Sequence, residues 1–194
     1  MRRRVLLATL PVVALGAVMS DATAATTPTA ASLGLDPENT LYLDLKDGRV
    51  VIQLLPDLAP KAVAHVKELT RAGFYDGTPF HRVIDGFMAQ GGDPTGTGTG
   101  GSKLGNVPAE FTRVRKFVRG AVGAARSSDP DSADSQFFIM FAPAPSLDGQ
   151  YTIWGQVVSG MPFVDAIKKG SGGNGQVSSP DKIVHMQVAA DVKG

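Results

Sequence analysis

The stretch FHRVIDGFMAQGGD, residues 80–93, says most about how this chain folds. This stretch can form two short strands with a turn between them. In each strand, alternate residues point to opposite faces. Arg82 and Ile84 would share one face of the first strand, and Met88 and Gln90 one face of the second. The result is an apolar pocket with a fixed cation at its edge. Such a site suits a neutral, partly apolar ligand that offers a carbonyl group, and it suits neither proton abstraction nor metal binding.

The composition around this stretch indicates one β-rich domain. Of 194 residues, 43% are hydrophobic and 19% are charged, which fits a single globular body with a sizeable core. The 23 glycines and 13 prolines argue for many turns. The sequence contains no cysteine, so no disulfide can form.

The first 24 residues have the pattern of a secretory signal peptide. A basic start at residues 2–4 precedes an apolar run over residues 5–19, and small residues follow at 22–24. We expect cleavage near Ala24/Ala25, which would make the mature chain periplasmic or secreted. A retained membrane anchor is the rival interpretation, although the apolar run is short beside the ~20 residues of a spanning helix.

Loss of residues 1–24 would change the charge balance of the chain. The full sequence has 19 basic and 18 acidic residues, and the mature part would keep 16 and 17, a net charge of −1. This gives no electrostatic reason for nucleic-acid binding. We expect a monomer that has no membrane contact after cleavage.

The start of the mature chain predicts a leader followed by a hairpin. Residues 25–39 are rich in Ala, Thr and Pro and predict a flexible leader, so that the globular domain would span residues 40–194. Residues 40–46 and 49–55 read as paired strands, and Asp47-Gly48 between them is a turn signal.

Helical spacing predicts two helices. One follows Pro56, with Asp57 as its cap, an apolar stripe (Ala62, Val63, Val66, Leu69) and Gly73 as its end. The other is expected over residues 161–169. Further strands are predicted at 118–125, 136–141, 151–158 and 182–190. Many strands with two helices and no βαβ rhythm indicate a mainly β fold, a closed antiparallel barrel capped by the helices.

Together with a second motif, the opening stretch resembles the cyclophilins, the peptidyl-prolyl cis/trans isomerases. The second motif is SQFFI at residues 135–139, and a Gly-rich loop at 96–102 and a strand at 120–125 lie between the two, in family order. Leu147-Asp148-Gly149 and the segment at 154–158 follow. The resemblance covers about residues 40–190. It implies an exported isomerase of bacterial type with an eight-stranded barrel, no cofactor and no metal.

In such a family member Arg82 would be the catalytic residue. The X-Pro bond resists rotation because the nitrogen shares its lone pair with the carbonyl, which creates a barrier of ~18–20 kcal/mol. Rotation frees that lone pair. A guanidinium that donates to it, or that holds the prolyl carbonyl, binds the twisted amide better than either planar form. Lysine could not reproduce the planar fork.

The resemblance also implies a set of substrate-binding residues. Of the adjacent Phe137 and Phe138, one should face the core and one the pocket, and the family assigns Phe138 to the pocket. The proline pocket would be formed by Phe87, Met88, Phe138 and Leu147. Gln90 and Gln136 would hydrogen-bond the peptide backbone, Ala125 and Arg126 would pair with it as a strand, and His81 and Tyr151 would lie beside the site.

Three positions depart from the family pattern. Ser146 stands where many cyclophilins have a tryptophan at the pocket rim, which predicts weaker inhibition by cyclosporin-type compounds. Tyr151 replaces a histidine and is bulkier, although it can still stack and donate a hydrogen bond. Arg126 stands where family members often have asparagine.

Other site patterns in the sequence are weaker. Gly96, Gly98 and Gly101 match G-x-G-x-x-G but do not open a helix within a βαβ unit. The three histidines, at 65, 81 and 185, are far apart, and without cysteine they do not support a zinc site.

We therefore expect an isomerase acting on proline-containing segments of unfolded or partly folded exported proteins. Two alternatives stay open: a cyclophilin-fold peptide-binding or chaperone module with little turnover, and a non-catalytic envelope adaptor.

Overall fold

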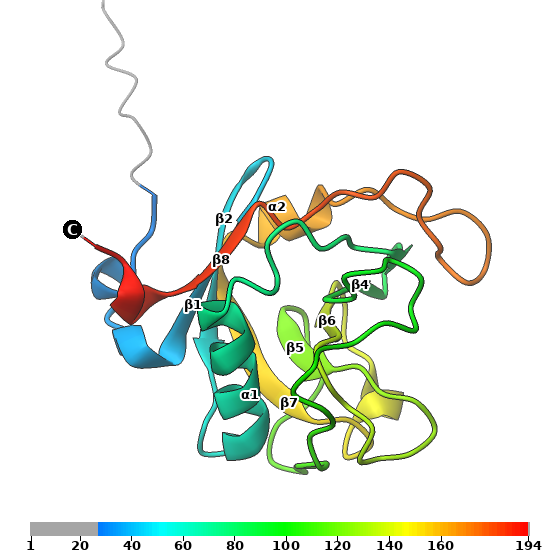
Figure 1. Cartoon of the computed structure of the whole chain (residues 1–194), viewed down its shortest axis with the longest axis horizontal. Coiled ribbons are helices and arrows are strands. Elements are labelled where there is room, and N and C mark those ends of the chain that lie inside the picture. Colours follow the sequence, from blue (N-terminus) through cyan, green and yellow to red (C-terminus); the bar gives the residue numbers. More distant parts are fainter. Residues whose placement is uncertain (1–26, 194) are drawn as a thin grey trace, which may run out of the picture.

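The computed structural model describes residues 27–193, and the expected signal peptide lies outside this range. Within it, eight strands form one antiparallel sheet in the order β3-β4-β6-β5-β7-β2-β1-β8. Their bounds are β1 Thr40–Leu45, β2 Gly48–Leu54, β3 Arg82–Ile84, β4 Met88–Gly91, β5 Ala121–Ala124, β6 Phe137–Met140, β7 Ile153–Ser159 and β8 His185–Val188. Helix α1 (Pro60–Arg71) packs on β7 and β8, and α2 (Met161–Asp165) packs on β2, as the curled sheet in Figure 1 shows.

The two end strands of the sheet, β3 and β8, are joined through the segments that precede them. The Gly77 amide donates to the Ile183 carbonyl over 2.8 Å, and the Ile183 amide donates to the Thr78 carbonyl over 2.9 Å. The Phe80 amide donates in the same way to the Asp181 carbonyl over 2.9 Å. The mainly β, eight-stranded antiparallel fold with two helices is therefore confirmed. Hydrogen bonds between residues 77–80 and 181–183 join the two ends of the sheet, and β3 and β8 do not pair directly.

The predicted hairpin at the start of the domain is also confirmed. β1 pairs with β2 from Thr40–Gln53 to Leu45–Gly48, so the turn is Lys46-Asp47, one residue earlier than expected, and Gly48 begins β2. The other strands have shifted or shorter bounds: β5, for example, covers four of the eight residues predicted at 118–125.

Strand β6 divides the interior into two apolar clusters. Phe137 and Ile139 point into the main core inside the sheet, together with Trp154. Phe138 and Met140 point to the other side, into a second cluster that includes Phe117, Met88 and Ile153. The predicted opposite orientation of Phe137 and Phe138 is confirmed, and the second cluster forms the floor of the candidate site.

The helix ends differ from the prediction because remote side chains fix them. Helix α1 begins after Ala59, and the Asp57 side chain does not cap it. The Glu110 carboxylate instead accepts hydrogen bonds from the Lys61 and Ala62 amides, over 3.0 and 2.9 Å. Helix α2 ends at Asp165, four residues earlier than expected. The chain leaves the helix there, and the Lys168 amide donates to the Asp181 carboxylate.

Part of the expected flexible leader is folded against the domain. The Ala30 amide donates to the Tyr42 hydroxyl over 2.6 Å, and Ala30 is buried. Leu35 packs on the same small cluster, and Glu38 forms ion pairs with Lys67 and Arg71 on α1. The sequence did not show these contacts, because Tyr42, Lys67 and Arg71 come close together only when the domain is folded.

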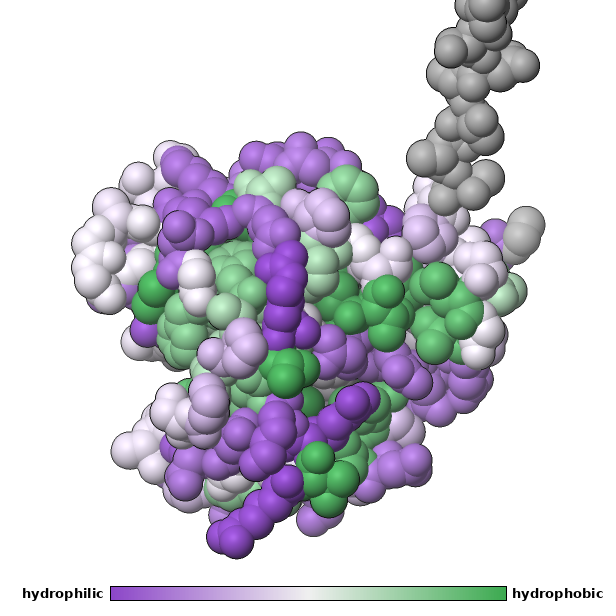
Figure 2. Space-filling view, turned by 180° about the vertical axis from the view of Figure 1, so that it is seen from behind, coloured by the Kyte–Doolittle hydropathy of each residue, from purple (hydrophilic) through white to green (hydrophobic). Residues whose placement is uncertain are grey.

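Large apolar side chains are mostly inside the molecule. Seen from behind, hydrophobic patches are separated by hydrophilic residues (Figure 2). Val114, at 85% exposure, is the most exposed large hydrophobic residue of the described chain. Between residues 27 and 193, no helix has the length and hydropathy needed to cross a membrane.

Candidate active site

The site is built on a row of residues that crosses four neighbouring strands. Arg82 on β3 lies opposite Gln90 on β4, Gln90 opposite Phe138 on β6, and Phe138 opposite Gly123 on β5. Directly paired residues of antiparallel strands share a face, so the guanidinium, the amide and the aromatic ring point to the same side. Gly123 is needed in this row, because a Cβ there would lie 2.6 Å from the Phe138 ring and 2.8 Å from the Phe117 ring.

A hollow of about 210 Å³, with apolar side chains in its floor and polar groups at its edges, lies over this row, and we call it the proline hollow. Its floor contains Phe138, which stacks on Phe117 with ring centroids 5.5 Å apart. The Tyr151 ring meets Phe138 edge-on at 5.7 Å. The hollow brings together most of the predicted site residues: Arg82, Phe87, Met88, Gln90, Ala125, Arg126, Phe138, Leu147 and Tyr151.

Arg82 is held at the edge of the proline hollow by two hydrogen bonds. Its Nε donates to the Asn174 carbonyl over 2.9 Å, and its Nη1 donates to the Gln90 Oε1 over 3.2 Å. Gln90 in turn donates to the Gln136 Oε1 over 3.0 Å. The guanidinium keeps further N–H groups for a ligand, because five are available in all. Arg82 is therefore fixed in place with no acidic partner among residues 27–193.

Gln136 links this chain of hydrogen bonds to the Gly-rich loop. Its Nε2 donates to the Gly98 and Gly100 carbonyls over 3.0 and 2.9 Å. The loop itself is wound around the buried Asp93 carboxylate, which accepts from the Thr95 hydroxyl and from the amides of Thr95, Gly98 and Gly100. Gly100 allows this close approach, because a Cβ there would lie 2.0 Å from Asp93 Oδ1.

These hydrogen bonds lower the pKa of the Asp93 carboxyl group. Burial by itself would raise its pKa, but the Thr95 hydroxyl and the amides of Thr95, Gly100 and Gly98 lower the pKa to about 2. The carboxylate therefore stays ionised at neutral pH and keeps the loop in place.

His81 directly precedes β3, and unlike the half-buried Arg82 it is buried. It is 6% exposed, and within the described chain neither ring nitrogen has a hydrogen-bond partner. Burial lowers its pKa, and the nearby Arg82 adds to this. Asp93 and the Pro79 carbonyl act in the opposite direction, although the carbonyl does not meet hydrogen-bond geometry with the ring. His81 does not line the proline hollow; it borders a neighbouring hollow with Thr97 and Asn174.

Arg126 and Tyr151, two of the departures from the family pattern, contact each other. The Arg126 guanidinium lies 4.4 Å from the centroid of the Tyr151 ring. Its Nε and Nη2 donate to the Gln150 carbonyl, over 3.2 and 2.8 Å, and its Nη1 donates to the Ser127 carbonyl over 2.8 Å. Both residues border the proline hollow, while Ser146 is exposed beside Leu147.

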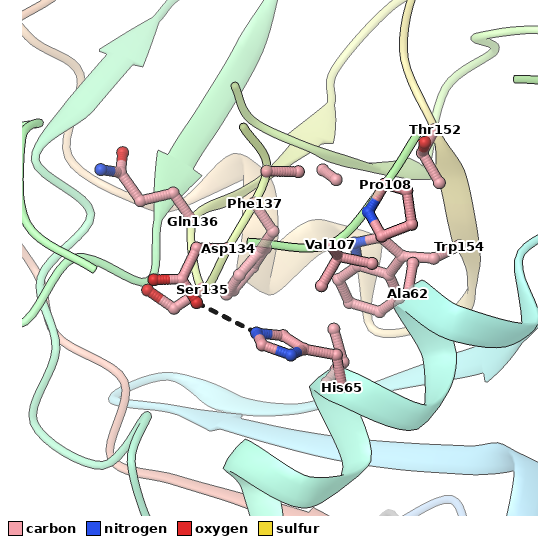
Figure 3. Close-up of a pocket in the computed structure, with 13 residues that line it drawn as sticks. Ala62, His65, Val107, Pro108, Asp134, Ser135, Gln136, Phe137, Thr152 and Trp154 are labelled. Atoms are coloured by element: carbon pink, nitrogen blue, oxygen red, sulfur yellow. Dashed lines mark hydrogen bonds and ion pairs between the residues drawn. The ribbon is translucent and has the colours of Figure 1, made fainter. Parts of the chain in front are cut away.

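A second, much smaller cavity lies behind the site, between α1 and the segment that leads into β6. It has a volume of about 10 Å³. In Figure 3 the His65 ring faces Asp134 across it at 3.0 Å, while Gln136 points away toward the groove. Asp134 also accepts hydrogen bonds from the amide and the hydroxyl of Ser102. This cluster, in which His65 takes part, supports the wall that carries Gln136.

Three contributors to the site were not predicted. Phe117 supports the floor, Gly123 makes room for it, and the Asn174 carbonyl orients Arg82. No sequence motif marks Phe117 or Asn174, because their roles depend on which segments meet in space. The pair of glycines at 120 and 123 in an otherwise apolar strand was a usable signal, since a strand glycine often marks close approach.

Comparison with known proteins identifies the family. The model described as "Cyclophilin type peptidyl-prolyl cis-trans isomerase/CLD" matches residues 40–188. A protein of Brucella suis called a probable peptidyl-prolyl cis-trans isomerase is 56% identical over 170 residues, or 81% of this chain and 86% of that one. Human peptidyl-prolyl cis-trans isomerase-like 1 is 41% identical over 129 residues, or 66% of this chain and 78% of the human one.

Solved structures agree with this result. A cyclophilin from Hirschia baltica has a TM-score of 0.73 at 28% identity, and the match covers 81% of this chain and 76% of that one. A cyclophilin-type isomerase from Cryptosporidium parvum, crystallised in the presence of the dipeptide Ala-Pro, has a TM-score of 0.70 at 29% identity, covering 77% of this chain and 98% of that one. With the family match over residues 40–188, these likenesses show that the chain belongs to the cyclophilin-type peptidyl-prolyl cis-trans isomerases.

Proposed function

We propose that the chain isomerises X-Pro bonds in unfolded or partly folded exported proteins, with Arg82 as the catalytic residue. The observation that carries the proposal is the oriented Arg82 guanidinium at the edge of a hollow of about 210 Å³ whose floor is apolar. The hollow suits a prolyl ring. The Ala-Pro dipeptide present with the Cryptosporidium parvum relative supports the same class of ligand.

The chemistry asked of Arg82 is selective binding of the twisted amide. As the bond rotates, the prolyl nitrogen becomes pyramidal and its lone pair can accept a hydrogen bond. An N–H group of Arg82 that is not used by Asn174 or Gln90 would donate to it, or to the prolyl carbonyl. Because Arg82 is already oriented, little reorganisation is needed in the transition state. Gln90 and Gln136 would hold the peptide backbone.

The test measures the cis-to-trans rate of an Ala-Pro peptide with purified residues 25–194. We expect Arg82→Ala to lower kcat/KM by about 10²-fold or more, the usual loss for a preorganised donor to a transition state. Arg82→Lys should lose nearly as much, because lysine cannot form the planar fork. Arg115→Ala is the matched control, since Arg115 is exposed and borders none of the hollows at the site.

The outcomes separate the proposal from its alternatives. Acceleration that survives in the Arg82 variants would mean that another residue is catalytic. A folded protein that binds the peptide without accelerating its isomerisation would instead favour the peptide-binding or chaperone module.

The proposed location rests on the sequence of residues 1–24. We propose that this segment directs export and is removed, and that the mature chain acts as a monomer in the periplasm or outside the cell. N-terminal sequencing of the exported protein should begin at or near Ala25, and light scattering should give the mass of one chain. A product that starts at Met1 and stays in the membrane fraction would support the retained anchor.

A further inference from the structure

Two further hollows adjoin the proline hollow, and Arg126 borders all three. One, of about 430 Å³, is lined by Thr99, Asn106 and Ser132, and we call it the loop-side hollow. The other, of about 390 Å³, is the one that His81 borders; Gln176 also lines it, and we call it the Asn174-side hollow. Gln90 is the other residue that belongs to all three. A peptide whose proline fills the proline hollow and whose flanking residues enter either neighbouring hollow therefore passes close to Arg126.

The positive charge of Arg126 is held in place without being neutralised. All its hydrogen bonds within the described chain go to main-chain carbonyls, those of Gln150 and Ser127, and its flat face rests on Tyr151. These bonds use three of the five N–H groups of a guanidinium. The side chain is half-buried, so a fixed cation with free donors faces the groove.

Acidic side chains are scarce around this cation. Within residues 27–193, no Asp or Glu lines the proline hollow or the Asn174-side hollow. Asp134 borders the loop-side hollow, but its carboxylate is engaged by His65 and Ser102. Asp129 and Asp131, on the loop after Arg126, border none of the three hollows. Arg82 adds a second guanidinium, so the groove is cationic although the mature chain is close to neutral.

We propose that Arg126 makes the enzyme selective for segments in which an acidic residue flanks the proline. A glutamate or aspartate near the prolyl residue would accept hydrogen bonds from the free N–H groups of Arg126, whereas a lysine there would be repelled. This inference rests on the proposed isomerase function and names the substrate class for the same site. It gives Arg126 a role beyond the main-chain pairing that the family resemblance implied.

The expected effect is moderate, because the site is open to water. Partly exposed ion pairs contribute little, which corresponds to about a two- to five-fold preference in kcat/KM. The preference should fall as salt is added, because the Debye length shrinks from about 30 Å at 0.01 M to about 3 Å at 1 M. A preference due to the shape of the glutamate side chain would not respond to salt in this way.

The experiment compares peptides that differ in charge alone. Peptides of the form Xaa-Ala-Pro-Phe, Ala-Xaa-Pro-Phe and Ala-Ala-Pro-Xaa, with Xaa as Glu, Gln or Lys, are isomerised by the natural chain at low and high salt. The ratio of kcat/KM for Glu over Gln should be about two to five at one or more positions at low salt, and the ratio for Lys over Gln should be below one. In Arg126→Gln both ratios should approach one. In Arg126→Lys, which keeps the charge, they should persist.

Arg115→Gln is the matched control, because it removes the same charge from an exposed site outside the groove. It should keep the ratios of the natural chain. Equal rates for Glu and Gln at every position, or a preference that survives in Arg126→Gln, would overturn the inference. If the Gln peptides are not accelerated at all, the isomerase proposal fails instead. Binding of the same peptides, measured by fluorescence anisotropy, then still decides whether Arg126 selects acidic segments.

Discussion

His81 is buried beside Arg82, and both of its ring nitrogens lack a hydrogen-bond partner among the residues that the structure describes. The strand alternation in the sequence places His81 on the face that Val83 shares, and Val83 is fully buried. The family resemblance instead assigns His81 to substrate binding. In the structure its ring lies under the Gly-rich loop, with Nε2 3.6 Å from the place a Gly98 Cβ would occupy.

We predict that His81→Leu stabilises the protein. A buried polar group without a partner costs about 1–3 kcal/mol, and leucine removes that cost, so the free energy of unfolding should rise by about 1 kcal/mol at pH 7.5. Because burial lowers the pKa of folded His81, the unfolded chain takes up the proton first as the pH falls. The natural chain therefore loses stability below about pH 6.5, and the variant escapes this loss.

Urea unfolding at pH 7.5 and 5.5 would measure both effects. The advantage of His81→Leu should be larger at the lower pH. His65 and His185 are present in both proteins with the same partners, Asp134 and Asp76, so the comparison isolates His81. A variant that is less stable at both values would show that His81 has a partner, such as a bound water, that stabilises it.

Among the elements, the Gly-rich loop depends on a single side chain. Asp93 accepts four hydrogen bonds from the loop, and the loop carbonyls of Gly98 and Gly100 hold Gln136 at the groove. The sequence indicated a glycine-rich loop at the rim, but it did not show that Asp93 lies at the centre of this loop, because a single acidic residue just after a strand has no distinctive pattern. Asp93 has this role because the loop turns back and brings the amides of Gly98 and Gly100 to its carboxylate.

We predict that Asp93→Asn lowers the free energy of unfolding by about 2 kcal/mol at pH 7, because the pKa of Asp93 is held at about 2, below its unfolded value of ~3.9. This stability is present above about pH 4 and is lost as the pH falls through about 2. The difference between natural chain and variant should therefore shrink in acid. Urea midpoints at pH 7 and 3 would measure it, with the exposed Asp57→Asn as control. A difference that stays constant with pH would contradict the role of the charge.

At the scale of elements, some features could be predicted from the sequence and others could not. The β1–β2 hairpin and the two short strands around Gly86 were predictable because alternation and a turn signal are local properties. The helix ends were not, since Glu110 caps α1 and Asp181 binds the chain after α2. The apolar part of the site was assigned through the resemblance, whereas its support by Phe117 and Gly123 depends on strand register.

At the scale of the whole molecule, the fold depends on contacts between distant segments. The sheet closes through the segments at 77–80 and 181–183, and the strand order places β8 beside β1 at the other end of the chain. The sequence predicted a barrel from its many strands, but it gave no sign of how the ends would meet. For the same reason it did not show that the segment before Thr40 joins the folded body.

The segment before Thr40 allows a test of whether such distant contacts stabilise the molecule. Ala30 is buried against Tyr42, and Glu38 forms ion pairs with Lys67 and with Arg71, which also binds Asp191 near the C-terminus. A chain that starts at Thr40 loses these contacts. We predict that it is less stable than residues 25–194 by about 2 kcal/mol, from one hydrogen bond, a small apolar contact and partly exposed ion pairs.

The truncated chain should keep its isomerase activity, because every residue that lines the proline hollow lies after Thr40. Urea unfolding followed by Trp154 fluorescence would give the stability difference, and the Ala-Pro assay would give the activity. Glu38→Gln in residues 25–194 is the intermediate variant. It removes the ion pairs and leaves the Ala30–Tyr42 contact, so it should lose well under half of the effect. Equal stability of the long and short chains would mean that the segment is a loosely attached leader after all.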